Sequence, residues 1–115
     1  MARFGIITAL ESEADCLGRS HKCSDLLNFV SGIGSVAAAR ASSRAIEAGC
    51  DMLVSYGYAG ALDPKLRAGD LLIGLSVSNE ATTIEIDGDV GKQLISDIEK
   101  TKGIGAHSSL FYAAP

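Results

Sequence analysis

The sequence lacks tryptophan, has only two prolines, and is five per cent aromatic. It also lacks an apolar run of the roughly 18 residues that cross a bilayer. Its start leads into a short strand-like run and not into the apolar core of a signal peptide. The net charge is −4, with lysine and arginine scattered singly, so no basic stripe offers a surface to nucleic acid. We therefore expect a cytoplasmic protein that binds neither membranes nor nucleic acids.

Cysteine is scarce as well. Cys16, Cys23 and Cys50 cannot all pair and show no CxxC spacing, so we expect buried or half-buried free thiols. Cys16, His21 and Cys23 lie close together in the sequence, but a zinc site needs a fourth ligand or an open position that nothing nearby supplies. We expect no metal and no cofactor.

Glycine, in contrast, is plentiful, and it lies among short aliphatic runs that suit tight junctions between strands and helices. Residues 4–8 form an apolar run without alternation, which is typical of a strand buried on both faces. Residues 9–17 have helical spacing, with acids in the first turns, where the helix dipole favours them. Further strands are predicted at residues 26–30, 52–55, 71–75, 81–86 and 104–112, and further helices at residues 35–48 and 90–100, followed by the caps Gly49 and Gly103.

Strands that alternate with helices at these lengths predict parallel βαβ units. We therefore expect an α/β fold of three α-β-α layers with a mostly parallel central sheet, and a single domain over residues 1–115. Ligands of such sheets bind beyond the carboxyl ends of the strands. Three loops lie there, at residues 8–13, 32–35 and 56–62, and we expect the chemistry in them.

The turn after the second strand fits the spacing G-x-G-x-x-[GA] from Gly32 to Ala37. A dinucleotide site would need an acid at the end of the next strand, and a receiver domain would need an aspartate there. Tyr56 and Gly57 occupy that place, so both classes are excluded. What remains is either a turn whose N–H groups face an anion or hydroxyl, or a turn that serves packing alone.

Two glutamates begin the first helix. Glu11 and Glu13 are two residues apart and point in different directions, so at most one faces the strand ends. Buried there, it would have a raised pKa and could act as an acid–base group. The alternative is that it only interacts with the helix dipole.

Three segments resemble, in the same order, motifs of the methylthioadenosine and S-adenosylhomocysteine nucleosidases of the nucleoside phosphorylase superfamily. They are GIITALESE at residues 5–13, SGIGSVAAA at 31–39, and SYGYAGALDP at 55–64, followed by LRAGD at 66–70. The resemblance covers about residues 4–75, and the third motif and the short stretch before the second strand resemble the hopanoid-associated nucleosidase/phosphorylase branch. It implies a truncated phosphorylase/hydrolase-like fold, the N-terminal half of such a domain.

The resemblance also implies roles for individual residues. Glu13 would orient or deprotonate the attacking water. The substrate-binding positions would be Ala9, Leu10, Gly32, Gly34, Tyr58, Ala59 and Gly60. Ala59 and Gly60 would approach the ribose and base with bare backbone, whereas Tyr58 stands where relatives have a small hydroxylated residue. The implied partner is a purine nucleoside or adenine-type small molecule, and the implied oligomer is a homodimer.

The expected reaction is hydrolysis of an N-glycosidic bond. A phosphorylase holds phosphate, usually with arginine, and Ser55 stands where the phosphorylase branches have that arginine. The strand that bears the base-protonating aspartate in relatives does not occur in these residues, so we expect the activity to be impaired or incomplete. Two alternatives stay open: a phosphate-dependent phosphorylase, and a catalytically inactive module that binds nucleosides or oligomerises.

Overall fold

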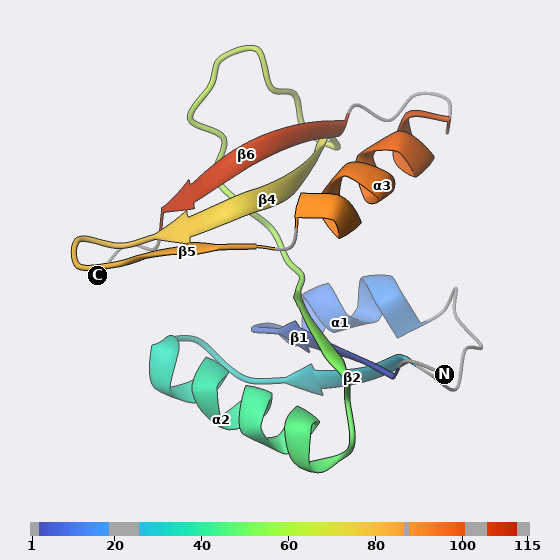
Figure 1. Ribbon diagram of the computed structural model, residues 1–115, viewed down its shortest axis with the longest axis vertical. Coiled ribbons are helices and arrows are strands. Elements are labelled where there is room, and N and C mark those ends of the chain that lie inside the picture. The colour runs from blue at the N-terminus through green and yellow to red at the C-terminus, as the bar shows by residue number, and fades with distance from the viewer. Residues whose placement is uncertain (1–2, 19–25, 87, 101–105, 113–115) are drawn as a thin grey trace. The chain divides into compact units, whose positions relative to one another are not determined.

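The computed structural model describes residues 3–18, 26–86, 88–100 and 106–112, and Figure 1 shows them as coloured ribbons. The chain divides into two compact units, Met1–Gly60 and Ala61–Pro115, here called the first and second unit. Each unit contains a three-stranded sheet. The predicted α/β class with a parallel sheet is confirmed, and the single domain stays a prediction. None of the described helices is long and apolar enough to span a membrane.

The first unit has an all-parallel sheet. Its strands β1 (Phe4–Thr8), β2 (Leu26–Val30) and β3 (Met52–Ser55) are paired in the order β2-β1-β3. All three have the predicted bounds. The central strand β1 is the most buried, and its apolar run without alternation reflects cover on both faces.

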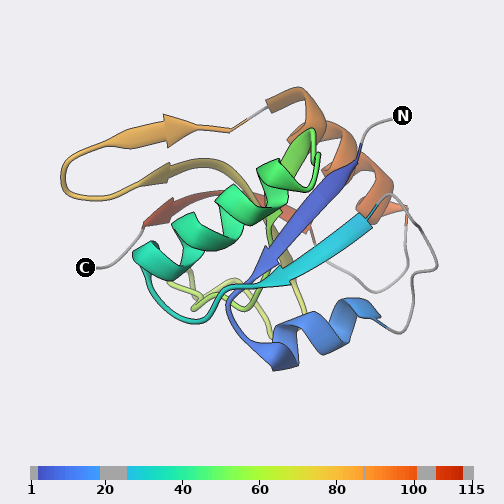
Figure 2. The same cartoon turned by 90° about the horizontal axis from the view of Figure 1, so that it is seen from below.

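The two helices of the first unit, α1 (Glu11–Gly18) and α2 (Ser35–Glu47), lie on opposite faces of this sheet (Figures 1 and 2). Right-handed connections require this arrangement, because the chain moves from β1 to β2 in one direction and from β2 to β3 in the other. The three predicted layers are therefore present in this unit.

Helix α2 packs closely on the sheet through alanines. Ala41 and Ala45 are fully buried, next to Ile7, and half-buried Phe29 and Cys50 complete the cluster. The helix ends where the sequence predicts, because Gly49 has φ +87° and donates its N–H to the carbonyl of Ile46.

The second unit has a mixed sheet. Its strands β4 (Leu71–Ser78), β5 (Thr83–Glu85) and β6 (Ala106–Tyr112) are paired in the order β5-β4-β6, with β5 antiparallel and β6 parallel to β4. Helix α3 (Gly88–Glu99) packs on β4 and β6.

The bounds in the second unit differ from the prediction. Strand β4 continues past residue 75 through an irregularity between Gly74 and Ser76, and β5 is shorter than residues 81–86 because Asn79 forms a turn with Thr82. The predicted cap Gly103 and the start of the predicted last strand lie outside the described residues.

Candidate active site

The loops that follow the three parallel strands meet at the end of β1. Backbone N–H groups of Ser31, Gly32 and Tyr56 donate to the carbonyls of Thr8, Ala9 and Ile7 at 2.8, 3.1 and 3.0 Å. Pairing with β1 thus continues beyond the regular strands. Since the strand order reverses at β1, this edge is the topological switch point of the sheet, where open α/β sheets bind ligands.

The carboxylate of Glu13 lies between two of these loops. Its Oε1 accepts the N–H groups of Ala9 and Leu10, each at 3.0 Å, and its Oε2 accepts the N–H of Tyr58 at 2.8 Å. The side chain is only 6% exposed. Glu13 therefore fastens the start of α1 to the loop that follows β3. Glu11 is exposed, so the structure separates the two glutamates as their spacing predicts.

The pKa of Glu13 is lowered, and the expectation of a raised pKa was wrong. The hydrogen bond from the N–H of Tyr58 is the largest cause, and those from Leu10 and Ala9 add to it. Burial acts in the opposite direction, but the three N–H donors outweigh it because they stabilise the charged form. Glu13 is therefore ionised at neutral pH and is a weak general base.

Glu13 also has little accepting capacity left. An ionised carboxylate offers roughly four lone-pair positions, two on each oxygen. Both positions on Oε1 and one on Oε2 are taken by the three N–H groups. About one position on Oε2 remains, which is enough to orient a single water or hydroxyl group.

Gly57 is a functional position that the sequence does not reveal. A Cβ at this residue would collide with the carboxylate of Glu13, so only glycine allows the loop after β3 to come this close. The sequence marks Gly57 as part of a turn, but the partner of this close approach is 44 positions away and is visible only in the fold.

The other predicted residues occupy the same edge with different amounts of free backbone. The N–H groups of Ala9 and Leu10 donate to Glu13, so these residues can contact a ligand only through their other atoms. Ala59 and Gly60 are exposed, and a Cβ at Gly60 would meet nothing within 4 Å. The backbone at Ala59 and Gly60 is therefore open, and their role in substrate binding stays a prediction.

In the glycine turn, Gly32 and Gly34 have φ values of +86° and +105°, which L side chains rarely adopt. The N–H of Gly32 is bonded to the carbonyl of Ala9, and that of Ser31 to Thr8. These two groups are not available to an anion. Binding of an anion or hydroxyl group by this turn is therefore limited to the N–H groups at the start of α2, where Gly34 provides no side-chain cap.

Tyr58 and Cys16 form a contact that the sequence analysis missed. The Tyr58 hydroxyl lies 3.4 Å from the sulfur of Cys16 on α1, and the ring is 69% exposed. The hydrogen bond with the Cys16 thiol is the main cause of a raised pKa of Tyr58. Cys16 is free but exposed, so burial was the wrong expectation for it, whereas free Cys50 is half-buried. The position of Cys16, three residues after Glu13 on the same helix face, was the one feature of the sequence that pointed to this contact.

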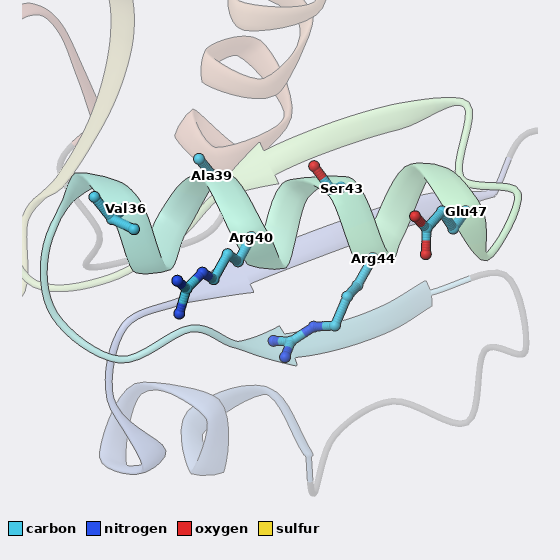
Figure 3. A pocket seen from close by; sticks show the side chains of 6 residues that line it. All are labelled: Val36, Ala39, Arg40, Ser43, Arg44 and Glu47. Atoms are coloured by element: carbon cyan, nitrogen blue, oxygen red, sulfur yellow. The ribbon is translucent and has the colours of Figure 1, made fainter.

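A hollow lies on the outer surface of α2, away from the buried alanines. It has a volume of about 570 Å³ and is lined by Val36, Ala39, Arg40, Ser43, Arg44 and Glu47 (Figure 3). All of its lining comes from one helix, and the Arg44 guanidinium donates to the carbonyl of Val30. Within the ranges that the structure describes, no group of three histidine, cysteine or acidic side chains could hold a metal ion.

A parallel sheet with a switch point, and a buried carboxylate that joins the loops there, make the strand ends the candidate site of this α/β protein. The family model of the phosphorylase superfamily matches residues 21–107. The chain belongs to this superfamily. No curated protein sequence matches it significantly.

Solved structures with the same fold include nucleosidases. The 5′-methylthioadenosine/S-adenosylhomocysteine nucleosidase from Neisseria meningitidis, in complex with methylthio-immucillin-A, has a TM-score of 0.85 and 21% identity over 98% of this chain and 64% of its own. The S-adenosylhomocysteine nucleosidase from Streptococcus pyogenes, in complex with 5-methylthiotubericidin, has a TM-score of 0.82 and 17% identity over 98% of this chain and 63% of its own.

A variant of the Helicobacter pylori nucleosidase with 5′-methylthioadenosine in its active site has a TM-score of 0.73 and 18% identity, over 99% of this chain and 66% of its own. The chain thus spans less than two thirds of the length of these three structures. At these identities the likeness shows the fold.

Proposed function

We propose that this chain binds a purine nucleoside of the adenine type at the carboxyl ends of β1, β2 and β3. We propose further that it is the N-terminal half of an enzyme that hydrolyses N-glycosidic bonds. The observation that carries the proposal is the buried, ionised Glu13 at the switch point of a phosphorylase-superfamily sheet. The nucleosidases with the same fold, one of which holds 5′-methylthioadenosine, support this class of ligand.

Glu13 would act by orientation more than by proton abstraction. Its lowered pKa makes it a weak base, while one free position on Oε2 can accept a hydrogen bond from a water or a ribose hydroxyl. Loss of the base leaves positive charge on the ribose, as in other glycoside cleavages. A fixed carboxylate that needs no reorganisation stabilises such charge.

The bare backbone beside Glu13 would provide the nucleoside surface. Ala59 and Gly60 are exposed and carry little or no side chain, so a flat base and ribose could approach their peptide groups closely. Leu10, 40% exposed, would add apolar contact, and the turn at Gly32 and Gly34 would close the other side. These contacts are apolar or made by backbone, as small-molecule sites commonly are.

Water is favoured over phosphate as the nucleophile. Residues 8–13, 31–35 and 56–60 contain neither arginine nor lysine, and phosphate sites depend on charge-assisted hydrogen bonds from such cations. The phosphorylase alternative and the hopanoid-associated branch stay predictions. So does the homodimer, which analytical ultracentrifugation tests.

The test combines binding with base release. Isothermal titration with 5′-methylthioadenosine should show binding, and any release of adenine, followed by chromatography, should not depend on phosphate. Glu13→Gln should reduce release at least about tenfold, whereas exposed Glu11→Gln should leave it unchanged. Circular dichroism tests whether both variants are folded.

Each outcome has a distinct meaning. Binding without release in the unchanged chain supports the alternative of an inactive nucleoside-binding module. Release that requires phosphate supports the phosphorylase alternative. Absence of binding to 5′-methylthioadenosine, adenosine and inosine contradicts the proposed function.

A further inference from the structure

Helix α1 holds Tyr58 at two points. Glu13 accepts its backbone N–H at 2.8 Å, and the sulfur of Cys16 lies 3.4 Å from its hydroxyl. Glu13 and Cys16 are three residues apart and therefore lie on the same face of the helix. Both ends of one residue in the loop after β3 are thus fixed by consecutive turns of α1.

The direction of the second hydrogen bond follows from the thiol. Cys16 donates its single proton to the carbonyl of Ser12 at 3.4 Å, so its sulfur is left to accept. The hydroxyl of Tyr58 must then be the donor when both bonds are made. The raised pKa of Tyr58 agrees with this direction, because a donated hydrogen bond favours the protonated phenol.

The contact draws the tyrosine ring away from the strand ends. Helix α1 begins beyond the carboxyl end of β1 and runs back along the sheet, since β1 and β2 are parallel. Cys16 therefore lies about 4.5 Å further back along the helix axis than Glu13. A ring bonded there lies along the flank of α1. Without that bond, the ring could rotate towards Ala59 and Gly60, where the backbone is open.

We propose that Cys16 is a positioning residue, which holds the ring of Tyr58 along α1 and so keeps the space beside Ala59 and Gly60 open for the nucleoside. The inference rests on the proposed function. Tyr58 is a large residue where the family resemblance implies a small hydroxylated one. The Cys16 contact explains how this chain accommodates it.

Binding of 5′-methylthioadenosine by the 115-residue chain tests the inference. Cys16→Ala and Tyr58→Phe each remove the hydrogen bond and keep a large ring, so each should raise Kd about two- to fivefold. Cys16→Ser retains an acceptor at the same place and should stay close to the unchanged chain. Ser12→Ala, at an exposed position of the same helix, is the matched control.

The double variant decides how Cys16 acts. With Tyr58→Ser there is no ring to hold, so adding Cys16→Ala should leave Kd unchanged. A Cys16→Ala chain that binds as tightly as the unchanged one overturns the inference. So does a loss of affinity that persists in the Tyr58→Ser background, because Cys16 would then act without the ring.

Titration of the tyrosines by ultraviolet absorbance gives a second measurement that needs no ligand. Tyr58→Phe identifies the contribution of Tyr58 among the three tyrosines, and Cys16→Ala should lower the pKa of Tyr58. If the unchanged chain binds no nucleoside, the proposed function fails. The hydrogen bond is still judged by this titration, and an unchanged tyrosine curve in Cys16→Ala overturns it.

Discussion

The two units of the chain are built from similar parts, yet they use glycine and charge differently. In the first unit, a Cβ at Gly5 or Gly57 would meet neighbouring atoms at or below 3.0 Å, and a carboxylate is buried at the strand ends. Among the described glycines of the second unit, such a Cβ would come no closer than 3.3 Å, at Gly74, and at Gly91 its nearest contact would be an ordinary 3.5 Å. Among the described residues of that unit, no acidic side chain is buried.

The difference follows from topology. Reversal of strand order at β1 brings loops together at one edge, and their unpaired N–H groups need an acceptor. Glu13 meets that need for three of them. Among the described strands of the second unit, where β4 and β5 are antiparallel, no reversal of parallel strands creates such an edge.

The largest effect is expected where the first unit depends on its buried charge. Glu13→Gln turns an acceptor into a group that also donates, and leaves buried N–H groups poorly paired, so it should reduce the free energy of unfolding by about 3 kcal/mol. Urea unfolding followed by circular dichroism measures this. Glu11→Gln, at an exposed site, should change it by less than about 0.5 kcal/mol. Equal losses of stability in the two variants would contradict the conclusion that Glu13 joins α1 to the loop after β3.

Gly57→Ala should destabilise by about 2 kcal/mol, because the added methyl group displaces the Glu13 carboxylate. Gly60→Ala is the matched control, since its Cβ would meet nothing within 4 Å. The same unfolding experiment compares them. A Gly57→Ala chain as stable as Gly60→Ala would mean that the loop moves aside at little cost.

Gly5→Ala should cost about 1.5 kcal/mol. Its Cβ would lie 3.0 Å from the Cβ of Ala45 and from a methyl group of Leu53, and 3.1 Å from the sulfur of Cys50. In the Ala45→Gly background, Gly5→Ala should cost less, which thermal unfolding of the double variant against Ala45→Gly alone measures. An undiminished cost would show that β3, and not α2, limits the space.

A smaller change in the free energy of unfolding is expected when the pH is lowered. It is the pH-dependent share of the stabilisation that Glu13→Gln removes. Since the folded pKa of Glu13 is lowered, its contribution to stability is complete above the unfolded value of about 4.3 and is lost as the pH falls through the folded value. The stability difference between the unchanged chain and Glu13→Gln should therefore shrink below about pH 4.3. A difference that stays constant down to pH 3 would contradict the lowered pKa.

The smallest effect should have the opposite sign and lie in the second unit. Gly91→Ala, within helix α3 and at 3.5 Å from Ile73, should stabilise by about 0.5 to 1 kcal/mol, because alanine favours helix and the space admits a methyl group. Thermal unfolding compares it with Gly5→Ala. Destabilisation by both substitutions would remove the contrast between the two units.

The sequence predicts much of the first unit because its signals are local. An unbroken apolar run gives β1, a glycine with positive φ ends α2 at Gly49, and the spacing of Glu11 and Glu13 shows that they point apart. Prediction is poorer for β5, whose length depends on pairing with β4 and on a turn at Asn79. Pairing of that kind leaves little trace in the residues themselves.

By itself, then, the sequence determines the alternation of strands and helices, the edge of the sheet where the loops gather, and the candidate residue Glu13. Only the tertiary structure decides the state of that residue, because its pKa depends on an N–H from Tyr58, which is 45 positions away. The same holds for Gly57, whose lack of a side chain matters only through Glu13, and for Cys16, which acts only through Tyr58. Local patterns record what each segment forms, whereas proximity between segments arises only when the chain folds.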